Sequence, residues 1–294
     1  MYMVVARQLA IRILDSMWFL KDLTPPELEK RKNTLEYYLP RIKDDKERAE
    51  TLLELGRIEC LLGNTVQAAG RYHECLRLFR KIGDRLGIGR TLYCITLLHV
   101  ERGNVEKAEN VLRECMEFAK ECESLWLKAS CYVAKARLYF ERGEYGKAVE
   151  TSLKAFDMFG EIGDVDGMGR SLQNACLALM KEGKMEKTIE LLESIRDTWK
   201  ETSRENYVLT SLQLAAMYLS LGEIEKAEKL VKEAEVTSPR VSALVNMLKA
   251  SINLAMGNTP KAVEHAERAR ETLKKLGLKA DLASEILKIV KGLS

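Results

Sequence analysis

The chain of 294 residues is poor in proline, histidine and aromatic residues, and it has no long uninterrupted apolar run. Five prolines leave most of the sequence free to form helices, and the helix-favouring residues Ala, Leu, Glu, Lys and Arg are abundant. The 47 basic and 44 acidic residues nearly cancel and leave a net charge of +3. That balance argues against nucleic acid or an anionic membrane as the partner.

The seven cysteines form no CxxC pair, and their number is odd. We therefore expect no disulfide framework and, for most thiols, a place in the packed interior. The apolar N-terminal stretch, which includes Trp18 and Phe19, is interrupted by Arg7, Arg12 and Asp15. It predicts a packed helix rather than a secretory or membrane segment, so we expect a cytoplasmic protein.

No arrangement of residues in the sequence points to a reaction. The glycine-rich stretches 83–90 and 163–170 have neither a preceding strand nor the Lys-Ser/Thr pair of a phosphate-binding loop. His99 takes a position that other repeats fill with tyrosine, and His265 has no neighbours at metal-ligand spacing. The sequence therefore predicts no catalytic residues, no cofactor and no metal site, and we do not expect an enzyme.

A set of regularly spaced glycines is the strongest pattern in the chain, with intervals of 35 to 40 residues. They are Gly63, Gly103, Gly143, Gly183, Gly222 and Gly257. A small residue stands seven positions before each glycine, such as Gly56, and nearly every glycine is followed five positions later by alanine, such as Ala68. Small residues at these positions let helices approach closely, so each unit is predicted to be an antiparallel helix pair with a glycine turn.

This pattern resembles the tetratricopeptide repeat family, in six copies over roughly residues 48–275. The long period is similar to the subclass found in Leu-Gly-Asn-type adaptors and in transcription activators of the maltose-regulator type. The junction sequence of residues 82–90 recurs at 162–170. The predicted helix-ending residues are Gly83 and Gly163, and the predicted N-caps are Asp84 and Asp164. The resemblance implies an all-α, right-handed superhelical solenoid of antiparallel helix pairs, with about fifteen helices by counting two per repeat plus the ends.

Both ends of the chain depart from the repeat. Residues 1–47 are predicted to add a helix pair continuous with the array, with Thr24 as an N-cap and Pro25 in the first turn. Six repeats follow over 48–277, and residues 278–294 are predicted to form a capping helix. This helix is expected to dock on the sixth repeat and to cover apolar residues of the last two repeats, or to exchange with an apolar partner or a second copy in a homodimer. Those apolar residues are Leu209, Leu212, Leu219, Leu244, Met247 and Leu254.

In the family that the chain resembles, the first helix of each pair lines a concave groove. Arginine and asparagine on this face hold a bound peptide in the adaptor subclass, and Arg90, Arg170 and Asn174 match that pattern. The candidate partner-binding residues are Arg57, Arg90, Arg137, Arg170, Gln173, Asn174 and Gln213. A solvated helix face with scattered arginines remains the alternative interpretation of the same residues.

The function that these observations favour is a non-catalytic scaffold that binds a peptide or protein, with acidic groups of the partner meeting the arginines. One alternative is a regulatory or sensor module that binds a small ligand or a signalling protein. Another is a self-assembling structural protein whose ends stack.

Overall fold

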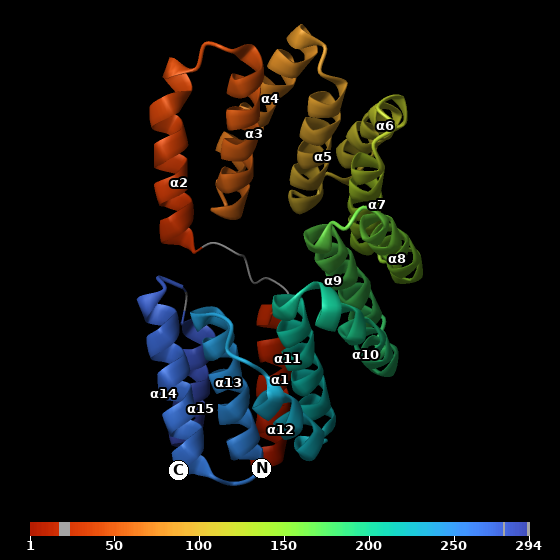
Figure 1. The fold of residues 1–294 in the computed structure, drawn as a ribbon. Coiled ribbons are helices and arrows are strands. Elements are labelled where there is room, and N and C mark those ends of the chain that lie inside the picture. The colour runs from red at the N-terminus through yellow and green to blue at the C-terminus, as the bar shows by residue number, and fades with distance from the viewer. Residues whose placement is uncertain (18–23, 279, 293–294) are drawn as a thin grey trace. The chain divides into compact units, whose positions relative to one another are not determined.

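The computed structural model describes residues 1–17, 24–278 and 280–292. In these ranges the regular elements are fifteen α-helices and one short 3-10 helix, η1 (Figure 1). The prediction of an all-α helical-repeat protein with about fifteen helices is confirmed. Residues Trp18 and Phe19, expected in the first helix, lie outside the described residues.

The helices follow one another with short turns. They are α1 (Tyr2–Met17), α2 (Pro25–Tyr38), η1 (Leu39–Arg41), α3 (Asp45–Leu61), α4 (Thr65–Ile82), α5 (Arg85–Glu101), α6 (Val105–Glu121), α7 (Leu125–Glu141), α8 (Tyr145–Glu161), α9 (Val165–Lys181), α10 (Met185–Thr202), α11 (Arg204–Leu221), α12 (Ile224–Glu233), α13 (Pro239–Ala255), α14 (Thr259–Lys275) and α15 (Asp281–Gly292).

The periodic glycines occupy the turns that the sequence predicts. All six have φ between 70° and 92°, in the left-handed region where a side chain is strained. Each lies between the two helices of a repeat, as Gly63 does between α3 and α4. The pairs α3–α4, α5–α6, α7–α8 and α13–α14 pack along their lengths, which confirms the antiparallel helix pairs.

The recurring junction sequence stops one helix and starts the next. Gly83 ends α4 in the left-handed conformation, and the Asp84 side chain accepts a hydrogen bond of 2.8 Å from the backbone N–H of Gly87. At the second copy, Gly163 has φ of 68°, and Asp164 accepts a bond of 2.9 Å from the N–H of Gly167. Both predicted pairs of caps are therefore present.

The helices divide into two compact units. The central unit contains α2 to α9 (residues 25–184), and the composite unit contains α1 together with α10 to α15. The first helix thus differs from its expected place beside the second, because α1 packs against α11 and α13 of the composite unit. The two helices differ in the surface they can bury: α1 has a continuous apolar stripe, whereas α2 buries only Leu28.

The C-terminal helix docks where the sequence predicts. Helix α15 packs against α14 and α13, the two helices of the sixth repeat, and buries Ala283, Ile286, Leu287 and Val290. The apolar residues Leu212, Leu219, Leu244 and Leu254 are also buried, with at most 3% of their surface exposed. The composite unit therefore covers most of the apolar stretch that the sequence shows in the last two repeats.

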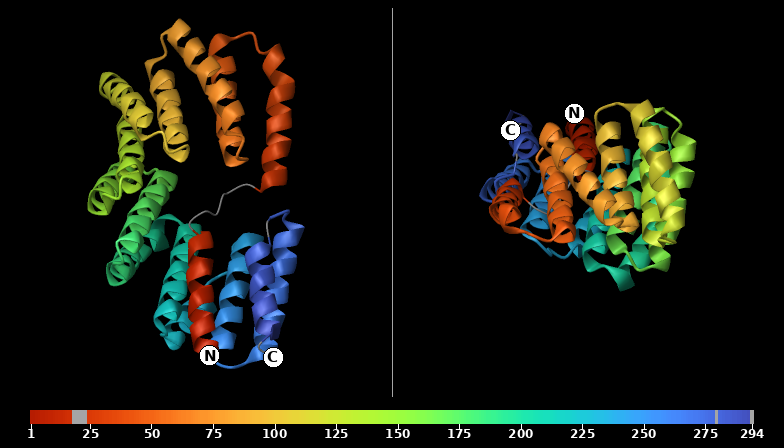
Figure 2. Two further views of the ribbon diagram at one scale, coloured as in Figure 1. Left: turned by 180° about the vertical axis from the view of Figure 1, so that it is seen from behind. Right: turned by 90° about the horizontal axis from the view of Figure 1, so that it is seen from above.

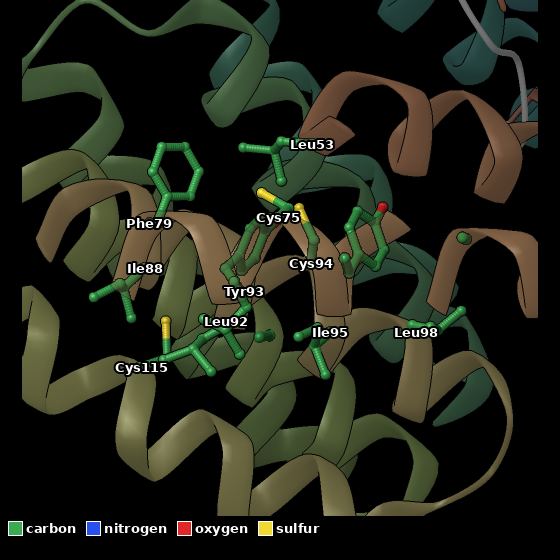
Figure 3. Close-up of a cluster of buried hydrophobic side chains, with 14 of the residues drawn as sticks. Leu53, Cys75, Phe79, Ile88, Leu92, Tyr93, Cys94, Ile95, Leu98 and Cys115 are labelled. Carbon is green, nitrogen blue, oxygen red and sulfur yellow. The ribbon is translucent and has the colours of Figure 1, made fainter. Parts of the chain in front are cut away.

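The core of the central unit lies among α3 to α7 (Figure 3). Leu53, Phe79 and Leu92 pack there with Cys75 and Cys94. All seven cysteines are free thiols, and five of them are buried. Their burial confirms that most thiols act as small apolar side chains in the interior.

Candidate functional site

The candidate residues are distributed over the first helices of successive repeats. Arg57 lies on α3, Arg90 on α5 and Arg137 on α7, whereas Arg170, Gln173 and Asn174 lie on α9. These helices belong to the central unit, where α3 packs on α5, α5 on α7, and α7 on α9. Gln213 lies on α11 in the composite unit and is not part of the site described below.

Three of the predicted arginines surround one tyrosine that the sequence analysis missed. Burial raises the pKa of Tyr93 on α5 to about 12, while the positive charges of Arg170, Arg57 and Arg137 act to lower it. The three arginines come from α9, α3 and α7, so four helices supply the cluster. We call Tyr93, Arg57, Arg137 and Arg170 the arginine cluster. Its tyrosine stays neutral at physiological pH and can both donate and accept a hydrogen bond.

The arginines of the cluster differ in exposure but share a lack of ionic partners. Arg137 and Arg170 are exposed, and Arg57 is half-buried. Within the described part of the chain, neither Arg57 nor Arg137 forms an ion pair, and Arg170 approaches only Asp164, at 4.0 Å. Positive charge on this face is therefore poorly compensated by the protein itself.

Arg90 behaves differently from the other arginines. Its Nη1 donates a hydrogen bond of 2.7 Å to Oε1 of Glu50 on α3. Both side chains are partly exposed, at 27% and 38%. Because its charge is matched by an acidic residue of the preceding repeat, Arg90 joins neighbouring repeats together and is not counted in the arginine cluster.

A tryptophan connects the arginine cluster to the junction between α8 and α9. The Trp126 ring meets the Tyr93 ring edge-on, with centroids 6.3 Å apart and planes at 79°. Its Nε1 donates a hydrogen bond of 2.9 Å to Oδ2 of Asp164, the N-cap of α9. The capping residue thereby fixes an aromatic wall of the site. Trp126 occupies no recurring position of the repeat, so the repeat pattern carries no signal for it.

The other candidate residues on α9, Gln173 and Asn174, are half-buried. Their amide groups can donate and accept hydrogen bonds at once, which suits the backbone of a bound segment. They lie three and four residues after Arg170 and therefore close to it on the helix.

The histidines take structural positions. His99 is half-buried, and burial lowers its pKa. His265 lies 3.0 Å from Oδ1 of Asn246, measured from Nδ1, and burial lowers its pKa as well. Among the described residues, no three His, Cys, Asp or Glu side chains are grouped so that they could hold a metal ion. The helices described here also include none with the length and apolar character to cross a bilayer.

These features define a class, a helical-repeat protein with an arginine-bearing inner face. Family models then give the repeat its identity: residues 47–121 and residues 129–160 each match a tetratricopeptide repeat model. The matches and the fold together support the resemblance to the tetratricopeptide repeat family. None of the curated proteins compared with the chain matches it at a significant level.

Solved structures share the fold at low sequence identity. One is a signal transduction ATPase with numerous domains, with a tetratricopeptide repeat sensor, from Pyrococcus horikoshii (TM-score 0.67, 18% identity, 89% of this chain covered). The alignment spans only 41% of that larger protein. A second is a Rap protein complexed with competence and sporulation factor (TM-score 0.60, 17% identity, 90% of this chain and 70% of that one). A third is NprR in complex with its cognate peptide NprX (TM-score 0.51, 12% identity, 97% and 82%).

Proposed function

We propose that this protein is a non-catalytic scaffold that binds an acidic peptide or protein segment on the inner face of α3, α5, α7 and α9. The observation that carries the proposal is the arginine cluster. Arg57, Arg137 and Arg170 gather around Tyr93, and two of them have no ionic partner in the described residues.

The chemistry of the cluster suits a carboxylate on an extended partner. A guanidinium group forms two parallel hydrogen bonds with a carboxylate, which gives both strength and orientation. The Tyr93 hydroxyl adds a neutral donor among the charges. Gln173 and Asn174 on α9 are proposed to hold the backbone of the partner, with Arg90 remaining paired to Glu50 until a partner competes for it.

Two of the similar structures support peptide binding as the kind of function. The Rap protein is complexed with competence and sporulation factor, and NprR is bound to its cognate peptide. The similarity of the repeat spacing to the long-repeat adaptor subclass points the same way. The free thiols support a cytoplasmic location, which we include in the proposal.

A regulatory or sensor module is the second candidate function. It is favoured by the similarity to the Pyrococcus horikoshii protein, in which tetratricopeptide repeats form a sensor. In that role the arginine cluster would still bind an acidic group, but the group would belong to a small ligand or a signalling protein.

The proposal is tested by reversing charge at the two exposed arginines. We expect Arg137→Glu with Arg170→Glu to weaken binding of fluorescein-labelled acidic 12-residue peptides by at least about tenfold, because like charges then face each other. Fluorescence anisotropy measures the affinity, against a peptide pool in which glutamine replaces each acidic residue. The melting temperature should hardly change, since exposed charges contribute little to stability.

The matched control makes the same charge change on another helix. Lys107→Glu with Arg113→Glu alters two exposed residues of α6 and should leave peptide binding intact. If the acidic pool binds no better than the glutamine pool, or both double variants bind equally well, the arginine cluster is not a binding site.

A further inference from the structure

Helix α1 occupies a groove of the composite unit as a bound peptide would. It lies between α11 and α13 and packs equally along both, with a smaller contact to α15 (Figures 1 and 2). One stripe of α1 is buried, at spacings of three and four residues. The stripe consists of Ala6, Leu9, Ala10, Ile13, Leu14 and Met17, none more than 5% exposed.

The surface beneath α1 corresponds to the open inner face of the other repeats. Six residues before the periodic glycine, the central unit carries Arg137, which is exposed, whereas the composite unit carries Ala216 and Ser251, both 0% exposed. Two residues before the glycine, Leu61 is 41% exposed and Ser220 is 5% exposed. Positions that are open in the first repeats are therefore covered in the last two, and their small side chains leave room for a helix.

Polar contacts orient α1 on this surface. The Arg7 Nε donates a hydrogen bond of 2.6 Å to the backbone oxygen of Ser220, in the last turn of α11. A positive charge there also meets the negative end of the helix dipole. Arg12 forms a two-pronged ion pair with Glu285 of α15, at the exposed edge of the contact.

The arrangement has the features of helix-in-groove recognition, in which anchors at i, i+3, i+4 and i+7 enter an apolar groove. Every packing contact of α1 is with the composite unit, although 213 residues separate Arg7 from Ser220. The groove is thus built by one part of the sequence and filled by a distant one.

We propose that the groove between α11 and α13 is a docking site for an amphipathic helix of a partner protein, and that α1 is its resident competitor. The partner helix would present small and branched apolar residues at the spacing of the α1 stripe, with an arginine beside the end of α11. This site lies in the composite unit and does not depend on the arginine cluster. A partner gains access only by displacing α1, which the chain itself keeps at high local concentration.

The test uses the full chain with a protease recognition sequence inserted within residues 18–23. After cleavage, α1 is held by noncovalent contacts alone. A fluorescein-labelled peptide of residues 2–17 is the probe, and anisotropy follows its exchange with the resident helix. We expect saturable binding to the cut chain and at least about 100-fold weaker binding to the uncut chain, because the attached α1 competes.

Two variant peptides serve as competitors. Leu9→Asp with Ile13→Asp places charges in the buried stripe and should compete about 100-fold more weakly than the natural peptide. Val4→Asp with Ile11→Asp makes the same chemical change at positions that are 60% and 41% exposed, and it should compete within about threefold.

Several results would overturn the proposal. If the cut chain unfolds or aggregates, or if it never exchanges α1 for the probe, then α1 is a permanent part of the core. If the two variant peptides compete equally, the buried stripe does not define the ligand. If the uncut chain forms dimers that the probe dissociates, the groove serves a second copy of this chain and not a foreign helix.

Discussion

Gly87 and Gly167 lie where a helix passes directly over a buried phenylalanine ring of the preceding helix. A Cβ atom at Gly87 would stand 2.4 Å from the Phe79 ring, and one at Gly167 would stand 2.4 Å from the Phe159 ring. Both rings are fully buried and cannot move aside easily. The same contact thus fixes the spacing of helices at both copies of the junction.

We expect Gly167→Ala to lower the free energy of unfolding of the central unit by about 1–3 kcal/mol, because the added methyl group overlaps the Phe159 ring. Gly70→Ala is the control, since that glycine lies inside α4 and a Cβ atom added there would meet no other atom within 4 Å. It should raise stability by about 0.5–1 kcal/mol through helix propensity. Guanidinium titration followed by circular dichroism measures both, and equal effects would contradict the steric explanation.

Single residues differ in how far their roles follow from the sequence. The caps at Asp84 and Asp164 are predictable because they recur with the junction, and capping depends on local backbone geometry. Trp126 is not predictable, since its contacts with Tyr93 and Asp164 join residues far apart in the chain. The arginine positions follow from the repeat, but the Arg90–Glu50 pair depends on how neighbouring repeats align.

At the scale of the element, α9 begins at a residue with two structural tasks. Asp164 caps the helix through the N–H of Gly167 and also accepts the hydrogen bond of Trp126. Asp84 caps α5 in the same way, without a tryptophan, and approaches Lys46 at 3.5 Å. The comparison of these two residues separates capping from support of the aromatic wall.

We expect Asp84→Ala to destabilise the central unit by about 0.5–2 kcal/mol, the usual range for a lost N-cap. Asp164→Ala should cost about 1 kcal/mol more, because the indole N–H of Trp126 loses its acceptor. A double-mutant cycle with Trp126→Phe measures this coupling by denaturant unfolding. A coupling near zero would show that the indole hydrogen bond does not support α9.

Elements also show where sequence reasoning stops. The helices of the six repeats follow from apolar periodicity and glycine turns, which act over short distances. The burial stripe of α1 is equally visible in the sequence, but periodicity does not say which surface it meets. Only the complementary apolar face of α11 and α13 decides that, and the structure places α1 there instead of beside α2.

At the scale of the whole molecule, the two units differ in how the chain builds them. The central unit is one continuous segment, whereas the composite unit needs α1 together with α10 to α15. Helix α15 packs on α14 and α13 and is joined to α1 by the Arg12–Glu285 pair. The two ends of the described chain thus stabilise the same unit.

We expect truncation after Gly277 to lower the melting temperature of the composite unit and to promote association, because it uncovers apolar surface of α13 and α14. Ile286→Asp is a smaller change that should cost about 2–5 kcal/mol, since Ile286 is fully buried. Lys288→Asp, at an exposed position of α15, is the control. Calorimetry and sedimentation measure stability and association, and a truncated chain that melts unchanged as a monomer would show that α15 is dispensable.

The separation of α1 from its groove has a consequence during protein synthesis. The ribosome makes α1 first, yet the end of α11 that receives Arg7 is made 213 residues later. At about 5–20 residues per second, the nascent chain carries an uncovered apolar helix for roughly 10–40 s. During that interval the helix is an available ligand for chaperones or for the groove of a finished molecule nearby, so crowding on one messenger RNA favours exchange between chains.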